Sequence, residues 1–303
     1  MPPAAMVHAH LARLVVACLI AALLGVVPIA QTDPLADLLR RAAEFSQNFA
    51  RDAATLVADE SCQQSEFRLT RGPVARNEQE VQTLGRQSWR AEIAWVQTPE
   101  LEKVGHPWLE IRDVFEARGK MTSAGEPRLA SLFRLRSEQR LEEARRIVGE
   151  SARFNIGPVR RNWNASAVPL LVLHPVNSGR FTFRKKPSDT TDRGRLVRII
   201  EYEEKTTPTL IRLENDQNTA ASGEIWLDAT TGEVLRSVLR CGQPSYTGQL
   251  TVTYRRDKRL GLRVPSEMKE RFESAGGGSW VEGSCKYSNF RRFETSGRLI
   301  LQK

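Results

Sequence analysis

Hydrophobic residues recur at helical spacing near the start of the chain. From Leu35 to Leu56 they stand three or four positions apart, and charged residues occupy most of the positions between them. Asp33 and Pro34 come directly before this stretch, and both are favoured at a helix N-terminus. The pattern predicts one long amphipathic helix that lies on an apolar surface.

Beyond Ala58 the period changes, and apolar residues alternate with polar ones as in strands that have one buried face. Strands are expected at 67–70, 89–96, 108–117, 181–184, 196–202, 209–213, 223–228, 234–239, 250–255, 262–272 and 281–290. Short Gly-containing turns separate several of them, and short connections favour antiparallel neighbours. We therefore expect an antiparallel meander in a mainly β (α+β) fold.

One helical pattern interrupts the strands, from Ser137 to Ser151. An irregular passage follows it and contains the apolar run Val168 to Leu173. We expect this section, about 121–180, to form a helical or irregular flap over one face of the sheet. No linker rich in Pro, Gly or Ser divides the chain, so residues 31–303 are expected to form one domain.

The N-terminus has the layout of a secretory signal. Leu14 to Ala30 is an uncharged stretch of 17 residues, and it contains Gly25 and Pro28. It is short for a membrane-spanning helix, which needs about 20 apolar residues. We predict a signal peptide over residues 1–30 and a periplasmic or extracellular protein, with an uncleaved anchor as the alternative.

Composition and charge narrow the class of partner. Forty per cent hydrophobic residues exclude a disordered chain, and the formal net charge is +9. Basic residues gather in 151–200 and 251–303, which would suit anionic lipid or an acidic protein. Nucleic acid is not expected, because an exported protein rarely meets it. The excess of Arg over Lys, 36 to 9, also fits a simple effect of genome composition.

Three cysteines remain once the predicted signal is removed: Cys62, Cys241 and Cys285. At most one intramolecular disulfide can form, and spacing leaves all three pairings open. Cys241 and Cys285 both stand in strand-like segments that could be neighbours. The absence of a CxxC motif gives no support for a redox motif or a structural zinc site.

Motifs of the common catalytic classes are missing. The sequence has no GxSxG, P-loop or GxGxxG motif, and only His106 and His174 remain after residue 30. His174 is expected to be structural. The acidic pairs are expected to be solvated surface charges: Glu142 with Glu143, Glu203 with Glu204, and Asp113 with Glu116. We expect no cofactor, no metal and no enzymatic activity, with a hydrolase of unrecognised site as an alternative.

Tryptophans are the more informative residues. Most of them stand on strand-like segments: Trp89, Trp95, Trp108, Trp163, Trp226 and Trp280. Their ordinary role is core packing, but a sheet face only partly covered by the flap would leave them around an apolar cleft.

A short segment carries a family resemblance. Ile225 to Arg236 reads IWLDATTGEVLR, in which Asp228 can bond the following backbone and Gly232 can close a hairpin. Together with the order of elements, it resembles the periplasmic lipoprotein carriers of the LolA-like half-barrel superfamily, and also uncharacterised secreted bacterial proteins. The resemblance implies a strongly curved antiparallel sheet or half-barrel, whose concave face encloses an apolar cavity for acyl chains.

We therefore expect an envelope protein that binds a lipid or a lipidated protein, as a monomer. The expected cavity wall is Trp89, Ile93, Trp95, Phe181 and Phe183. The expected contacts with an anionic headgroup or partner are Arg180, Arg184, Lys185 and Lys186. The alternative is an interaction or sensing module that binds an envelope protein.

Overall fold

In the computed structural model the described residues are 34–71, 79–122, 128–157, 161, 163–212 and 217–293. Contacts between Cα atoms divide the chain into two units, Met1–Ala36 and Asp37–Lys303. The predicted signal peptide and Asp33 lie outside the described residues. Of the first unit only the first residues of helix α2 (Pro34–Ala53) are described. No helix in the described ranges is long and apolar enough to span a membrane.

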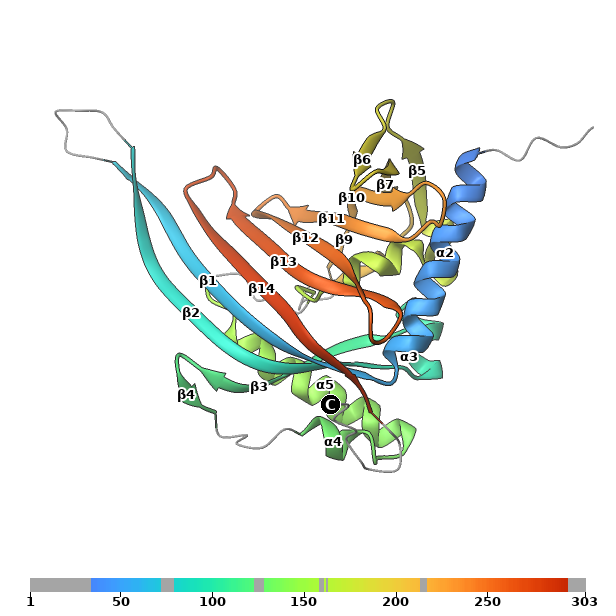
Figure 1. Ribbon diagram of the computed structural model, residues 1–303. Helices are drawn as coiled ribbons and strands as arrows, with labels where there is room; N and C mark the ends of the chain where they lie inside the picture. The colour runs from blue at the N-terminus through green and yellow to red at the C-terminus, as the bar shows by residue number, and fades with distance from the viewer. Residues whose placement is uncertain are drawn as a thin grey trace, which may run out of the picture. The chain divides into compact units, whose positions relative to one another are not determined.

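One antiparallel sheet of 12 strands dominates the second unit, and strands make up 52% of the structure. Its strands are β1 (Leu56–Arg71), β2 (Gln79–Val96), β3 (Leu109–Ala117), β4 (Lys120–Met121), β5 (Phe181–Lys185), β6 (Thr190–Asp192), β7 (Arg195–Glu204), β10 (Ser222–Asp228), β11 (Val234–Gln243), β12 (Tyr246–Asp257), β13 (Leu262–Ser274) and β14 (Ser279–Arg292). The sheet is strongly curved and does not close into a barrel (Figure 1). The expected mainly β class with a curved antiparallel sheet is confirmed.

The order of strands departs from a simple meander. Neighbours run β4-β3-β2-β1-β14-β13-β12-β11-β10-β7-β5, and β6 pairs with β7. The chain crosses from one edge of the sheet to the other between β4 and β5, so its first and last strands meet in the middle. Cys62 and Cys285 then lie opposite each other on β1 and β14 and form a disulfide, while Cys241 is free and buried. The pairing that spacing left open is therefore Cys62–Cys285.

Most helical structure lies between β3 and β5, where the flap was expected. It comprises α4 (Leu129–Leu132), α5 (Ser137–Ser151) and the 3-10 helices η1 (Ala152–Phe154), η2 (Val168–Leu173) and η3 (Pro175–Arg180). Helix α5 has the predicted bounds and packs mainly against β3 (Figure 1). Helix α3 (Pro99–Lys103) joins β2 to β3.

Several boundaries differ from the predicted ones; β1 and β2, for example, begin well before the strands expected at 67–70 and 89–96. Helix α2 ends at Ala53 instead of Leu56, because Leu56 begins β1 and pairs with β14. The strand expected at 209–213 is reduced to β8 (Ile211–Arg212), and Leu213 lies outside the described residues. Strand β8 pairs with β9 (Asn218–Thr219) in a separate two-stranded sheet instead of joining the main one.

Candidate functional site

The predicted aromatic wall of β2 belongs to the protein core. Trp89, Ile93 and Trp95 point to one face of the strand and are at most 2% exposed. The Trp95 ring meets Phe49 of α2 edge-on at 5.8 Å and stacks on Phe290 of β14 at 6.5 Å. We call this side the inner face of the sheet. The three residues share a face as expected, but side chains cover them completely.

Phe181 and Phe183 lie elsewhere, on β5 near the opposite edge of the open sheet. Phe181 is buried against Tyr202, with the ring centroids 5.8 Å apart, and Phe183 is half-buried at 6.3 Å from Phe181. The structure therefore does not bring the five predicted wall residues into one cluster.

An irregular stretch occupies much of the inner face. We call Asn155–Asn177 the inner segment; its residues 158–160 and 162 lie outside the described part. Three buried carboxylates hold it against the sheet: Glu60 on β1, Glu110 on β3 and Glu270 on β13. Buried carboxylates require hydrogen-bond donors or counter-charges, and each of these has them.

Glu60 forms a buried ion pair with Arg112 and also accepts a hydrogen bond from the Trp89 indole at 3.1 Å. Arg112 also binds the inner segment, because its Nη2 donates a hydrogen bond to the Asn164 carbonyl at 3.0 Å. Burial is the largest single effect and acts to lower the pKa of Arg112, but the charge and hydrogen bonds of Glu60, together with smaller effects of Tyr287 and Glu110, raise the pKa overall. Arg112 therefore remains charged inside the protein.

Glu110 accepts four hydrogen bonds. They come from the Trp95 indole at 3.1 Å, the Ser166 backbone N–H and hydroxyl at 2.9 and 3.0 Å, and the Ala167 N–H at 2.8 Å. Burial nevertheless raises the pKa of Glu110. Both carboxylate oxygens of Glu110 accept these hydrogen bonds, which join the inner segment to β2 and β3.

Two glycines make room for this packing. A Cβ on Gly283 would stand 2.6 Å from the Glu270 side chain, which crosses β14 to reach Gln64 of β1. A Cβ on Gly248 would stand 2.8 Å from the Trp163 ring. Glycine at these positions lets Glu270 and Trp163 lie flat on the sheet.

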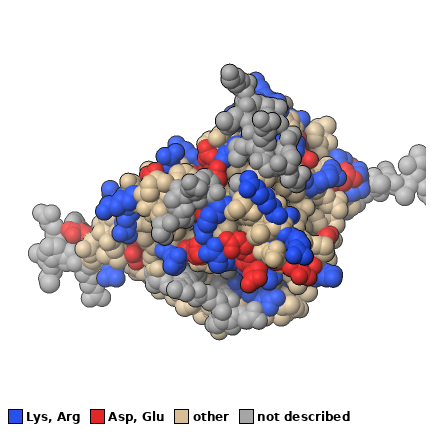
Figure 2. All heavy atoms as spheres, turned by 90° about the horizontal axis from the view of Figure 1, so that it is seen from below, with Lys and Arg blue, Asp and Glu red and all other residues tan. Residues whose placement is uncertain are grey.

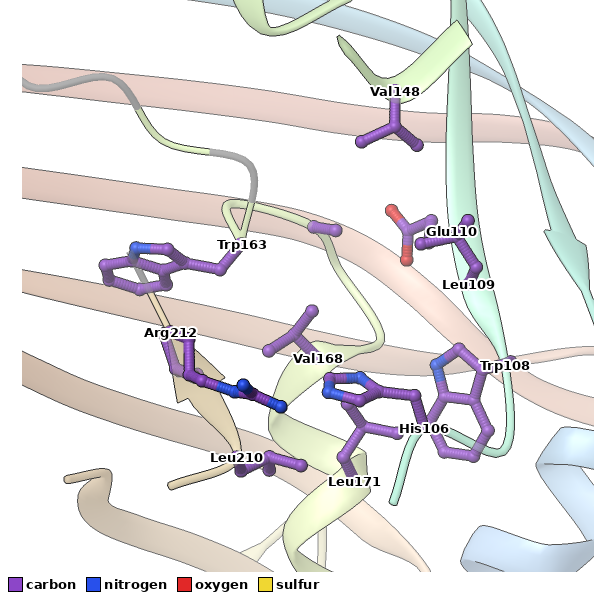
Figure 3. A pocket seen from close by; sticks show the side chains of 12 residues that line it. His106, Trp108, Leu109, Glu110, Val148, Trp163, Val168, Leu171, Leu210 and Arg212 are labelled. Atoms are coloured by element: carbon purple, nitrogen blue, oxygen red, sulfur yellow. The ribbon is translucent and has the colours of Figure 1, made fainter. Parts of the chain in front are cut away.

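A cavity of about 220 Å³ remains between the inner segment, β3, α5 and β8. Its lining is His106, Trp108, Leu109, Glu110, Val148, Trp163, Ala165, Val168, Leu171, Leu210, Ile211 and Arg212. Figure 3 shows Val168 and Leu171 of η2 facing His106 and Trp108, with Glu110 at the far side near Val148. The wall is largely apolar, and a few polar groups converge on it, as in small-ligand sites.

His106 lines this cavity, and its pKa is lowered. Burial has the largest effect, a hydrogen bond with the Leu210 backbone opposes it, and the charges of Arg180 and Arg212 lower the pKa further. His174 has the structural role expected of it. It is buried, it accepts the Val176 N–H at 3.4 Å, and its ring contacts Trp108.

The predicted basic cluster is spread out and paired with acids. Arg180 bonds Glu204 at 3.3 Å. Arg184 pairs with Glu201, and Lys186 with Glu201 and Glu224, on the outer side of β5 and β7. Lys185, which stands opposite Ile200 on the other face of β5, pairs with Asp189. On the face shown in Figure 2, acidic and basic side chains of the described residues are interspersed. Of the four, Arg180 alone acts electrostatically on His106 at the cavity.

Two further features do not form comparable sites. A hollow of about 490 Å³ on the outer face of the sheet is lined mostly by polar and charged side chains, such as Gln63, Gln249 and Lys269. Glu60, Cys62 and Cys285 stand within metal-binding distance of one another. The two sulfurs form the disulfide, so neither is a thiolate ligand.

Residues that sequence reasoning missed include Glu60, Glu110 and Glu270. The expectation that acidic pairs are solvated also fails for Asp113 and Glu204, which are buried and bonded to Arg128 and Arg180. A charged residue on an alternating strand is normally assigned to the solvent face. Their burial depends on donors from other parts of the chain: the inner segment for Glu110 and Glu270, and arginines on other elements for Glu60, Asp113 and Glu204.

The solved structures that are similar to this chain include the following two. A DUF1329 family protein from Desulfovibrio piger is 11% identical and aligns over 86% of this chain and 94% of its own, with a TM-score of 0.30. A putative outer membrane lipoprotein-sorting protein domain from Vibrio parahaemolyticus is 13% identical over 84% and 93%, also with a TM-score of 0.30. No family model matches the sequence, and no curated protein matches it. The second of these is described as a lipoprotein-sorting domain, the kind of protein that the sequence resembles.

Proposed function

We propose that this protein is exported to the cell envelope and binds an apolar ligand there, such as a lipid or an acyl chain, without catalysing a reaction. The observation that carries the proposal is the cavity of about 220 Å³ under the curved sheet, with nine of its lining residues apolar: Trp108, Leu109, Val148, Trp163, Ala165, Val168, Leu171, Leu210 and Ile211. Apolar surface of this kind gains free energy when a ligand removes it from water.

The size of the cavity limits the ligand. Pockets for drug-sized ligands usually measure about 300–1,000 Å³. At about 220 Å³ this cavity is smaller, because the inner segment occupies much of the inner face. It suits one short acyl chain, or the end of a longer one, better than several chains of a lipoprotein together.

Two observations support export. Residues 1–30 have the layout of a signal peptide, and Cys62 is bonded to Cys285. Disulfides persist in oxidising compartments such as the periplasm and are rare in the cytosol. N-terminal analysis of protein secreted by a bacterial host should find a chain that begins near Gln31. Intact Met1 in the membrane fraction would contradict cleavage.

Ligand binding is tested by filling the cavity. Val168→Trp places a large ring in it, while Val176→Trp alters an exposed position of the neighbouring η3. Protein purified without detergent is analysed by native mass spectrometry and titrated with a hydrophobic fluorescent dye. We expect bound lipid or dye in wild type and in Val176→Trp, and at least a tenfold loss in Val168→Trp.

If no apolar molecule binds to wild type, the carrier function is wrong. Capture of an envelope protein would then support the interaction or sensing module. Turnover that disappears with His106→Gln would support the hydrolase instead.

A further inference from the structure

The indole N–H of Trp108 is a buried donor in the wall of the cavity. Trp108 is 2% exposed, and its Nε1 has no hydrogen-bond acceptor among the described residues. Figure 3 shows this nitrogen on the side of the ring that faces His106 and Val168. The Nε1 of Trp163, 5% exposed in the same wall, also has no acceptor in the described part of the chain. Buried donors without acceptors are rare, because they cost free energy, and each one calls for an explanation.

Positive charge lies at the same end of the cavity. Arg212 lines it, and its guanidinium extends toward His106 in Figure 3. The charges of Arg212 and Arg180 both act on His106. The carboxylate of Glu110 lies on the other side, and its oxygens are bonded to Trp95, Ser166 and Ala167.

The cavity therefore has two unlike ends. One end has a hydrogen-bond donor and cationic side chains, and the wall also includes the apolar side chains of Val148, Val168 and Leu171. An aliphatic chain fits the apolar wall, and an anionic acceptor fits the end with Trp108 and Arg212.

We propose that the ligand is a short aliphatic monocarboxylate, whose oxygen accepts the Trp108 N–H beside Arg212 while its chain lies along η2. This inference rests on the proposed function, since it names the chemical class of the ligand in the same cavity. It also accounts for a tryptophan at position 108, because a phenylalanine would fill similar space without the donor.

The test compares two amphiphiles of equal chain length, octanoate and octylammonium, by isothermal titration calorimetry. Octylammonium has no acceptor and carries the opposite charge. We expect octanoate to bind at least tenfold more tightly. Trp108→Phe should weaken octanoate binding about tenfold or more, the effect of losing one hydrogen bond to a charged group, with octylammonium little changed.

Trp280→Phe is the matched control. The Nε1 of Trp280 also has no acceptor among the described residues, but Trp280 stacks on Phe67 at the outer face, away from the cavity. Arg212→Met is a second variant that leaves Trp108 in place, and it should reduce the preference for octanoate over octylammonium. Circular dichroism confirms that each variant is folded.

The outcomes separate the two proposals. If both amphiphiles bind equally to wild type, or if Trp108→Phe binds octanoate as wild type does, the carboxylate class is wrong and the apolar site stands. If neither amphiphile nor the hydrophobic dye binds, the proposed function itself is wrong.

Discussion

At the residue scale, buried and paired charged side chains stabilise the inner face of the sheet. Glu60 and Arg112 are both less than 10% exposed and face each other across β1–β3. Breaking such a pair leaves the remaining charge buried, which usually costs about 3–5 kcal/mol. Replacing both partners by apolar residues of similar size costs far less.

We therefore expect Glu60→Leu to lower the free energy of unfolding by about 3–5 kcal/mol. The double variant Glu60→Leu with Arg112→Met should recover a large part of the loss. Urea denaturation followed by tryptophan fluorescence measures both. Equal stability of the single and double variants would show that the charges are not coupled.

The two histidines make stability depend on pH. Burial lowers the pKa of both His106 and His174 from an ordinary value of 6.5. The unfolded chain therefore binds protons first as the pH falls, and stability is lost below about pH 6.5, through the folded pKa values. Glu110 acts in the opposite direction, because its pKa is raised.

The contribution of the two histidines to the pH dependence of stability is measured by comparing wild type with a variant that lacks both. The variant His106→Gln with His174→Asn should lose less stability than wild type between pH 7.5 and 5.5, as measured by urea denaturation at each pH. Parallel curves for the two proteins would contradict the assignment.

Sequence reasoning placed some site residues correctly and missed others for a physical reason. Period-two alternation placed Trp89, Ile93 and Trp95 on one face, as the structure has them. Alternation says nothing about what covers a face, so the cavity lies instead beside Trp108 and Trp163. The position of the cavity depends on where the inner segment packs on the sheet. That packing joins residues that are far apart in sequence, so local alternation does not predict it.

At the element scale, helix α5 covers the side of the sheet near its β4–β3 edge. Ala144 and Ile147 are fully buried in one cluster with Ala94 and Ile111 of the sheet. The pattern from Ser137 to Ser151 made this helix predictable, because its apolar stripe is local. The face of β2 that contains Ala94 is buried only because α5 packs there, which alternation could not reveal.

Ile147→Ala should therefore cost about 2–5 kcal/mol of unfolding free energy, because it leaves a cavity against β3. Arg146→Ala is the control on the same helix. Arg146 is 51% exposed and pairs only with Glu143 and Glu150 among the described residues, so its loss should cost about 1 kcal/mol or less. Chemical denaturation compares the two variants, and equal losses would show that α5 contributes little through packing.

At the scale of the whole molecule, the disulfide joins strands separated by 223 residues in sequence. Closing so long a loop restricts the unfolded chain and typically contributes about 2–4 kcal/mol. Cys62→Ala with Cys285→Ala should lower stability by that amount, as measured by urea denaturation without reductant. Cys241→Ala is the control, and it should have a smaller effect.

The free cysteine gives an independent check on the pairing. Cys241 is buried, and burial raises the pKa of its thiol, so the native protein should not react with a thiol reagent. In the chain without residues 1–30, which contain Cys18, one thiol should become reactive on unfolding without reductant. Three reactive thiols would exclude the Cys62–Cys285 bond.

The pairing of β1 with β14 also affects when the sheet can fold during synthesis of the chain. Strand β1 leaves the ribosome early, but the strand that completes its hydrogen bonding is the last of the sheet to be made. Until then the centre of the sheet cannot assemble, and an unpaired edge of β1 is open to association with other chains. We therefore expect folding to wait for synthesis to end and to require protection of the nascent chain. For a protein that crosses a membrane as an extended chain, that delay is an advantage, because a structure that cannot close early cannot block its own passage.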